Sequence, residues 1–263
     1  MIENALLDMR DRLTVERIEE WIRGRLKKAG DDLLIDAIPL KGTFMTFTDG
    51  ALFAGRTTAG KHAIEMIGSS VGRFVHRVTP SERGAKWADR RAADLVVQIS
   101  EGTRDALRRI VSMDNRRGIH PNSTAKAIRA VIGLDERRAI AVENYRLKLL
   151  DDGMSEDKVL VRTMRFAETK ITERARVIAR TESMAAVHEG RLDLWHELAD
   201  AKVVPSDKIQ REWVSARDER VDDECLELDG KTATLRGDFP GGAHDPPLHP
   251  QCRCTTMITV EGY

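Results

Sequence analysis

The chain lacks the features that mark secreted proteins, membrane-embedded proteins and proteins that attract nucleic acid by overall charge. Its 263 residues contain 43 Lys plus Arg and 43 Asp plus Glu, so no excess of one sign points to nucleic acid or an acidic membrane. The N-terminal residues MIENALLDMRDR mix acids, bases and apolar side chains, which argues against a secretory signal or a membrane anchor. We therefore expect a protein without a membrane partner that stays in the reducing cytosol where it is made.

Aromatic residues are also scarce, at 5% of the chain. The hydrophobic content of 41% is nevertheless too high for a disordered chain. A core of Leu, Ile, Val and Ala suits a mainly helical protein, and we see neither an internal repeat nor a low-complexity segment. The composition therefore predicts a folded, mostly helical chain.

Apolar residues recur at helical spacing up to Ala199. The segment Thr79-Pro80-Ser81-Glu82 has the form of a capping box and marks the start of one helix clearly. Residues 43–48 have strand-like composition, but they could also belong to a turn that leads into a helix. The predicted helices cover residues 2–26, 58–78, 80–113, 120–132, 135–150 and 155–199, the last with a break near 169–172.

The composition changes after Ala199, where Pro, Gly, Asp and Thr replace the Ala, Leu and Arg of the helices. Short alternating segments at 209–215 and 255–260 are typical of strands. The sequence therefore predicts a mainly α fold, in which a helical body is followed by a small, loop-rich C-terminal α+β unit.

The chain has only three cysteines, and all of them lie in this C-terminal unit. Cys252 and Cys254 are one residue apart, so an extended backbone places both sulfurs on the same side. Together with Cys225 and His249 they could complete a tetrahedral structural zinc site. Such a metal would stabilise a unit with few large apolar residues. Alternatively, the thiols are simply buried apolar groups, since the spacing is not that of the common zinc motifs.

A catalytic interpretation of the same cluster carries less weight. Cys252, His249 and Asp218 could act as nucleophile, base and orienting acid. The carboxylates of Asp218, Asp222, Asp223 and Glu224 could instead hold a hydrolytic metal. Acidic residues between arginines are more often a solvated, turn-rich face, so we do not expect an enzyme.

Arg180-Thr181-Glu182 interrupts an Ala-rich apolar stretch of the last predicted helix. Arg180 and Glu182 do not face each other on a helix, so we expect each to pair outside it, with Asp218 or Arg220 as candidates. Such contacts would fix the small unit on the helical body. The alternative is an exposed helix face.

Three segments together resemble the phage Mu F-like head morphogenesis family, the minor head proteins of tailed bacteriophages. They are IARTESMAAVHEG at 178–190, WVSARDERVDDECLELDGK at 213–231 and HPQCRC at 249–254. The resemblance covers residues 135–260. It implies a head morphogenesis domain over 135–263, helical at 135–200 and loop-rich α+β at 201–263, preceded by an N-terminal helical region over 1–134. The signature positions it implies are Arg180, Thr181, Glu182, Trp213, Asp218, Arg220, Cys225, Asp229, Gly230, His249, Pro250, Cys252 and Cys254.

The resemblance also implies a virion protein assembled in the host cytoplasm. Such a low-copy component binds the portal, enters the procapsid, and assists head assembly and DNA packaging or ejection. It strengthens the expectation of a zinc centre. Residues 1–134 would then be a docking arm for portal or scaffold, with the major capsid protein as a further partner. Two rival functions remain: a metal-dependent hydrolase or nuclease, and a DNA-binding internal head protein that uses the Arg-rich stretches 104–117 and 162–180.

Overall fold

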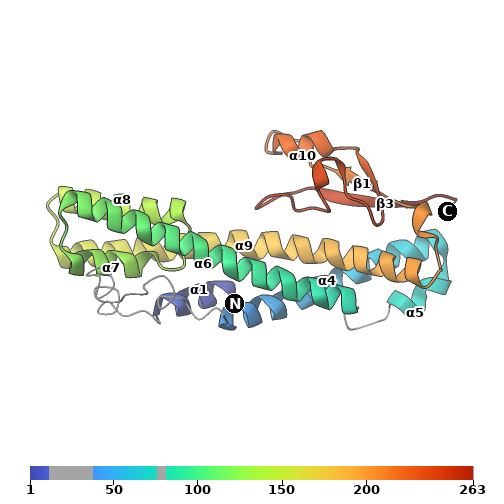
Figure 1. Ribbon diagram of the computed structural model, residues 1–263, viewed down its shortest axis with the longest axis horizontal. Helices are drawn as coiled ribbons and strands as arrows, with labels where there is room; N and C mark the ends of the chain where they lie inside the picture. The colour runs from blue at the N-terminus through green and yellow to red at the C-terminus, as the bar shows by residue number, and fades with distance from the viewer. Residues whose placement is uncertain (12–37, 76–80, 263) are drawn as a thin grey trace. The chain divides into compact units, whose positions relative to one another are not determined.

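The computed structural model describes residues 1–11, 38–75 and 81–262, and it confirms a mainly helical chain with a small C-terminal sheet (Figure 1). In chain order the described elements are α1 (Ile2–Asp11), α4 (Ile38–Ile67), a 3-10 turn (Ser69–Val71), α5 (Gly72–Val75), α6 (Glu82–Arg117), α7 (Pro121–Val131), α8 (Glu136–Asp151), α9 (Glu156–Asp200), a 3-10 turn (Ser206–Lys208), β1 (Ile209–Val214), α10 (Asp223–Leu228), β2 (Thr232–Thr234), a 3-10 turn (Pro240–Gly242) and β3 (Thr255–Val260).

The chain forms two compact units, and each is assembled from separate segments. Unit 1 consists of Met1–Phe44 and Ala92–Arg176, and unit 2 of Met45–Arg91 and Val177–Tyr263. The long helices α4, α6 and α9 contribute to both units. Each unit therefore draws on both sides of residue 135, and the family domain over 135–263 stays a prediction about sequence rather than a structural boundary.

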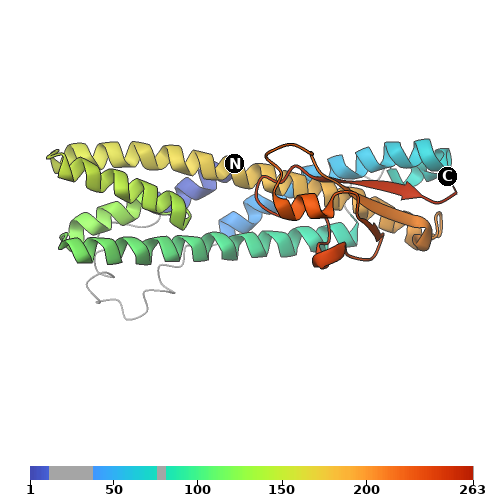
Figure 2. The same ribbon diagram turned by 90° about the horizontal axis from the view of Figure 1, so that it is seen from above.

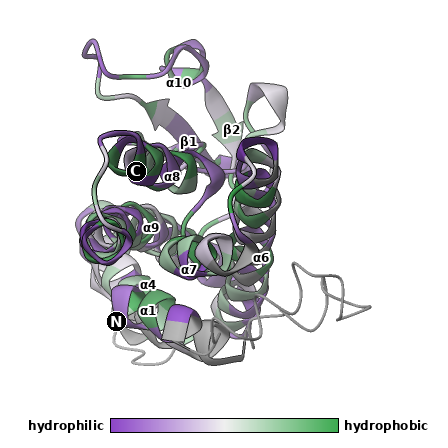
Figure 3. Ribbon diagram, turned by 90° about the vertical axis from the view of Figure 1, so that its left-hand side faces the viewer, coloured by the Kyte–Doolittle hydropathy of each residue, from purple (hydrophilic) through white to green (hydrophobic). Residues whose placement is uncertain are grey.

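Unit 1 packs its helices around an aliphatic core. α8 begins where the sequence predicts a helix, and the Asp135 side chain caps it by accepting a hydrogen bond from the Arg138 amide at 3.0 Å. Gly133 has a φ of 84°, and a Cβ there would lie 3.1 Å from the Leu6 carbonyl oxygen of α1. Hydrophobic and hydrophilic residues both appear around α6 and α9 in Figure 3, as in amphipathic helices. Fully buried core residues include Leu6, Ile110, Ile128, Val131 and Ile171.

Unit 2 joins helices to the sheet through one apolar cluster. Trp195 of α9 and Ile258 of β3 are both buried in it. Figures 1 and 2 show the sheet lying alongside the C-terminal part of α9. The other residues of this cluster include Ala63, Val71, Leu192, Leu198, Ile209 and Val260. The small C-terminal sheet is therefore not an independent body, since it shares its core with the helices of unit 2.

The sheet is antiparallel, with strand order β2-β1-β3. β1 pairs with β3 from Ile209 opposite Val260 to Val214 opposite Thr255. Its buried residues alternate, which confirms the predicted strand period. One of the inward positions is Arg211, whose side chain is fully buried.

The structure decides one segment that the sequence left open and corrects one predicted break. Residues 43–48, which could have been a strand or a turn leading to a helix, lie within α4, so their strand-like composition did not decide their conformation. Leu52, Ala59 and Ala63 of α4 are buried, and tertiary packing of this kind overrides local propensity. The predicted break near 169–172 is absent, because α9 is continuous over 45 residues. Thr169 and Thr172 each donate a hydroxyl hydrogen bond to the carbonyl four residues earlier, so both hydroxyls are satisfied without a break in the helix.

Other boundaries differ as well, by up to 20 residues at the start of α4, which begins at Ile38 and not at residue 58. The helix predicted over 58–78 ends at Ile67, where Gly68 adopts a φ of 102°. α6 begins at Glu82, and Ser81 Oγ accepts a hydrogen bond from the Gly84 amide at 3.3 Å. Thr79 and Pro80, the predicted cap, lie outside the described residues, as does the predicted helix beyond Asp11.

Candidate functional site

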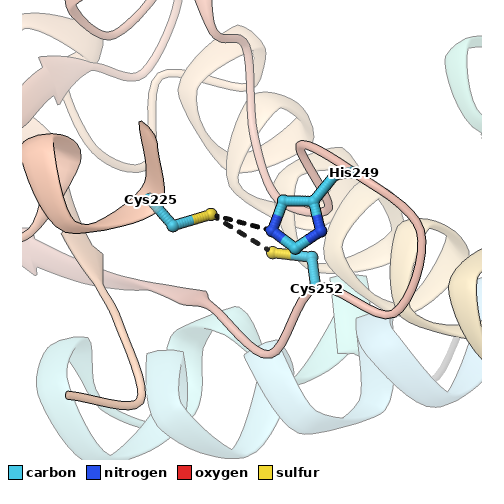
Figure 4. Close-up of side chains that lie close together, drawn as sticks. All are labelled: Cys225, His249 and Cys252. Carbon is cyan, nitrogen blue, oxygen red and sulfur yellow. Dashed lines mark hydrogen bonds between the residues drawn. The ribbon is translucent and has the colours of Figure 1, made fainter. Parts of the chain in front are cut away.

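The cysteine and histidine side chains come from two segments of residues 201–263, the C-terminal module of unit 2. Cys225 lies on α10, whose first turn forms as Asp222 O accepts hydrogen bonds from the Cys225 and Leu226 amides. His249 and Cys252 lie in the loop before β3, where the Cys252 amide donates to His249 O at 3.1 Å. This turn brings the imidazole and the thiol to the same side of the loop, opposite α10 (Figure 4).

The ligand atoms converge. Cys225 Sγ lies 3.3 Å from His249 Nε2 and 3.8 Å from Cys252 Sγ, and the three atoms all lie within 4.8 Å of one another. Cys254 is buried with Cys225 and Cys252 in a second apolar cluster, which also contains Trp213 and Phe239. The structure therefore brings together the side chains predicted from sequence, with Cys225, His249 and Cys252 as the tightest group.

The surroundings of Cys225 and Cys254 disfavour the ionised form of their thiols. Burial raises the pKa of Cys225, and the neighbouring Cys252 and Cys254 raise it further. Burial likewise raises the pKa of Cys254. A thiolate is the metal-binding form of cysteine, and a bound divalent cation would stabilise it against both effects. Sulfur and imidazole donors at this separation fit a tetrahedral zinc ion.

His249 is oriented by its backbone. Its Nδ1 lies 3.0 Å from Pro250 O, so a proton on Nδ1 leaves Nε2 as the ligating atom. That Nε2 also lies 2.9 Å from Asp222 Oδ2, which is an exposed carboxylate. Asp222 is thus the acidic partner of His249, whereas the sequence had suggested Asp218 for that position.

Two further signature residues, Asp229 and Gly230, make hydrogen bonds within the segment between β1 and β2 and do not contact the cysteine and histidine cluster directly. Asp229 accepts hydrogen bonds from the Ser215 amide and from Arg217 Nε, both at 2.8 Å. Gly230, with a φ of 74°, donates its amide to Trp213 O at 2.8 Å. These contacts close the segment between β1 and β2 and hold α10 against the sheet.

Asp218 is engaged elsewhere. Both of its carboxylate oxygens accept hydrogen bonds from the guanidinium of Arg253, the residue between Cys252 and Cys254 in the chain. This pair lowers the pKa of Asp218 well below its ordinary value. Asp218 therefore does not orient His249, and the arrangement differs from the nucleophile, base and acid considered from sequence.

The predicted partners of the Arg180-Thr181-Glu182 segment are corrected by the structure. Glu182 accepts two hydrogen bonds from Arg91 of α6, at 2.8 and 3.0 Å, rather than pairing with Arg220. Arg180 is exposed. Thr181 contacts the loop over residues 249–254, called the ligand loop below. Its Oγ1 accepts a hydrogen bond from the Gln251 amide at 3.0 Å. The sequence alone could not show which helix faces this one, because the Arg91–Glu182 contact spans 91 residues.

Two arginines, the half-buried Arg191 and the buried Arg211, anchor the sheet, and sequence reasoning missed both. Arg191 of α9 donates to Thr255 Oγ1 at 3.0 Å and to Thr256 O at 2.7 Å. Arg211 donates to His244 O at 2.7 Å and lies 3.3 Å from Asp245 Oδ1. Burial raises the pKa of Asp245 to about 6, despite these cations. The alternation of Ile209, Arg211 and Trp213 was a usable signal, since it places Arg211 on the inward face.

The Arg-rich stretches named for the DNA-binding alternative are mixed in exposure. Arg116, Arg117, Arg162 and Arg165 are exposed, whereas Arg174 is buried and donates to Gly133 O at 2.6 Å. Within the described residues, no helix is long and apolar enough to cross a membrane.

Comparison with known proteins yields one family. Residues 115–257, more than half of the chain, match the family described as Phage Mu protein F like protein. The match begins earlier than the resemblance seen in the sequence and contains all of the cysteine and histidine cluster. No curated protein and no solved structure matches the chain. The chain therefore belongs to the phage Mu F-like family, whose members are bacteriophage head morphogenesis proteins.

Proposed function

We propose that this head morphogenesis protein is a minor, portal-binding component that is built into the procapsid and assists DNA packaging or ejection. We further propose that a structural zinc ion holds its C-terminal module. The observation that carries the proposal is the convergence of Cys225, His249 and Cys252 inside the segment that matches the family. With Cys254 as a fourth ligand the set would be closed to water, and a closed set supports a role in shape rather than in catalysis.

The zinc would be held by Cys225, His249 and Cys252, with Cys254 as the fourth ligand. When bound, it would supply a crosslink between α10 and the loop that leads into β3, which are separated by a long stretch of chain. Asp222 would then move away from His249 Nε2, which is feasible because its side chain is 64% exposed. The Asp218–Arg253 and Thr181–Gln251 contacts would keep the ligand loop in place on either side.

Portal binding is proposed from the kind of surface the helices provide. α4 exposes Phe53 and Ile64, at 41% and 36%, on a helix that carries few charges. Amphipathic or apolar helix faces dock against other helices. A virion location inside the head or at the portal vertex follows from this proposal and from the family.

Co-expression with the portal and major capsid proteins of the same genome tests the function. Particles made with and without the portal are purified, and their proteins are quantified by mass spectrometry. We expect incorporation at low copy that depends on the portal. Equal incorporation without the portal would contradict portal binding, and complete exclusion from both kinds of particle would contradict the minor head role.

A further inference from the structure

Residues 158–176 of α9 carry a local excess of positive charge, although the chain as a whole is neutral. This part of the helix belongs to unit 1 and contains more than twice as many cations as carboxylates. The cations are Lys158, Arg162, Arg165, Lys170, Arg174 and Arg176, and the carboxylates are Glu168 and Glu173. The metal cluster and the portal-docking face of α4 use other parts of the chain, so neither accounts for this excess.

Four of these cations lie on one face of the helix, called the basic stripe below. They are Lys158, Arg162, Arg165 and Arg176, and all four are exposed. Their spacings of four, three and eleven residues are close to whole turns of an α-helix, so their side chains leave it on the same side. At 1.5 Å per residue the stripe is about 27 Å long. This is about the length of eight base pairs, at 3.4 Å each.

The carboxylates beside the basic stripe are engaged with other groups. The pairs are Glu168 with Arg10 of α1 at 3.4 Å, Glu173 with Lys170 at 2.9 Å, and Glu3 of α1 with the Thr172 hydroxyl at 2.7 Å. Two further exposed carboxylates, Glu156 and Asp157, stand in the first turn of α9, at one end of the stripe. In the part of the chain that the structure describes, none of the four stripe cations has an ion-pair partner within 4.0 Å.

Further cations line a hollow between α8 and the same part of α9. Its volume is about 340 Å³, and its lining residues are Arg137, Arg138, Ala141, Lys170 and Glu173. Arg138 is paired with Asp135, and Lys170 with Glu173. Arg137 is exposed and has no ion-pair partner within 4.0 Å among the described residues. The lining therefore carries three cations against one carboxylate, which favours an anion.

The basic stripe fits a phosphate backbone better than it fits a protein surface. Within residues 158–176, Val161 is the only large apolar side chain that is exposed. Protein interfaces are built around clusters of apolar and aromatic anchors, and charged residues are depleted from their cores. A guanidinium, in contrast, binds phosphate oxygens through paired N–H donors. A straight line of unpaired guanidinium groups is complementary to the regular line of phosphates along a DNA strand.

We propose that the basic stripe binds the phosphate backbone of duplex DNA without reading its sequence. This inference rests on the proposed function, according to which the protein works in a head that is filled with DNA. Arg162, Arg165 and Arg176 would each contact a phosphate and release its counterions. The hollow at Arg137 would hold a further phosphate. The protein would thus contact the DNA with unit 1.

The test is binding of the full-length protein to a fluorescein-labelled duplex of about 20 base pairs, measured by fluorescence anisotropy at several salt concentrations. For about four phosphate contacts, the logarithm of the association constant should fall with the logarithm of the salt concentration with a slope of about −4. Affinity should therefore drop about a hundredfold between roughly 50 and 200 mM salt. Duplexes of different sequence should compete equally. Absence of binding at low salt, or binding that does not respond to salt, overturns the proposal.

Charge variants locate the binding surface. Arg162→Gln, Arg165→Gln and Arg176→Gln together remove charge from the stripe, and glutamine retains a high helix propensity. The slope should change to about −1, and affinity at low salt should fall about tenfold or more. The triple Arg→Lys variant at the same positions keeps the charge and should keep most of the affinity and the slope. Circular dichroism checks that each variant is folded.

The matched control removes the same charge from the other unit. Lys61→Gln, Lys202→Gln and Lys231→Gln together change three exposed cations of unit 2, and this variant should bind the duplex as the unmodified protein does. Equal effects of the two glutamine triples would mean that overall charge governs binding, which contradicts a role of the stripe.

Labelled polyglutamate distinguishes DNA from an acidic protein partner. It should bind at least about tenfold more weakly than a duplex of the same charge, because its chain is flexible and its carboxylates are less densely spaced. Equal affinity would assign the stripe to an acidic protein and overturn the proposal. The anisotropy assay contains no portal protein, so its outcome is independent of the particle experiment that tests the proposed function.

Discussion

Gly190 of α9 lies directly against the backbone of Leu52 in α4, so that a Cβ at position 190 would be 2.1 Å from the Leu52 carbonyl oxygen. The contact is reciprocated three residues away on each helix, where a Cβ at Gly55 would be 2.0 Å from Val187 O. Real Cβ atoms do not approach a carbonyl this closely. α4 and α9 are therefore held at a distance that only glycine permits. Because the sheet packs on α9, these glycines also set the position of the helix that supports it.

Gly190→Ala should destabilise unit 2 although alanine is the better helix former. The added methyl must push the helices apart, and overpacking of this kind costs about 1–3 kcal/mol, more than the gain in helix propensity. Urea unfolding followed by circular dichroism measures the difference. Gly50→Ala is the matched control in α4, because nothing lies within 4 Å of a Cβ there, and it should raise stability by about 0.5–1 kcal/mol. Equal effects of the two substitutions would contradict the close contact.

Removal of zinc should unfold the C-terminal module but leave most helical circular dichroism intact. The metal-free thiols would return to a buried site that disfavours their ionisation, and α10 would lose its crosslink to β3. Purified protein should contain about one zinc per chain by elemental analysis. Treatment with EDTA should then raise proteolysis within residues 215–254.

The double variant Cys252→Ser with Cys254→Ser serves as the control for the chelator. It should lack zinc, show the protease sensitivity of the chelated protein, and respond no further to EDTA. If the double variant is as protease-resistant as the unmodified protein, the thiols contribute packing alone.

The parts of the fold that could be predicted are those fixed by local chemistry. Asp135 caps α8, and the alternation at Ile209–Val214 gives a strand, because both signals act over a few residues. Residues 43–48 could not be assigned from sequence for the opposite reason, since their helical conformation depends on their surroundings in α4. No local signal marked Gly190, because a glycine in a helix has the same appearance whether or not a backbone lies against it.

The candidate site shows the same division. The residue types of the cluster, three thiols and an imidazole, were visible as ligands, and the turn at His249 to Cys252 brings two of them together locally. Their approach to Cys225 depends on tertiary packing. The partner of Glu182 was not predictable, because Arg91 lies on a different helix and many arginines in the chain were equally suitable.

Thr181→Val should weaken zinc binding without unfolding the helices. Thr181 Oγ1 holds the Gln251 amide, which stands directly before Cys252 in the ligand loop. Loss of a contact that orients a ligand lowers metal affinity by about tenfold. Competition with a chromogenic chelator measures the affinity. Thr169→Val is the control, since Thr169 is exposed and its hydroxyl bonds only to Arg165 O within α9. A zinc affinity that is the same in both variants would argue against this positioning role.

The stability of unit 1 should depend on pH through Glu143. Burial raises its pKa from 4.5 to about 7, with Arg146 opposing the shift. Between these two values the folded chain binds more protons at this site than the unfolded chain does. The contribution of Glu143 to the free energy of unfolding is therefore full below pH 4.5 and is lost as pH rises toward 7, by about 2–3 kcal/mol.

Other buried groups titrate in the same range, so the effect of Glu143 must be isolated. Glu189 has its pKa raised to about 7 and acts in the same direction. His188 and His196, with pKa values lowered to about 4, act in the opposite direction, because they make the folded chain bind fewer protons below pH 6.5. The total pH profile of the protein is thus partly cancelled.

The contributions of the other buried groups cancel in the difference between the free energies of unfolding of the unmodified protein and of Glu143→Gln. Glutamine keeps one oxygen for Arg146 and cannot ionise, so the unmodified protein should lose stability relative to the variant as pH rises from 4.5 to 7. Urea unfolding at several pH values measures this difference. Glu136→Gln is the control, since that side chain is exposed at the start of α8, and its stability difference should change little over the same interval. A difference for Glu143→Gln that stays constant with pH would mean that the Glu143 carboxyl is ionised throughout and that Arg146 outweighs its burial.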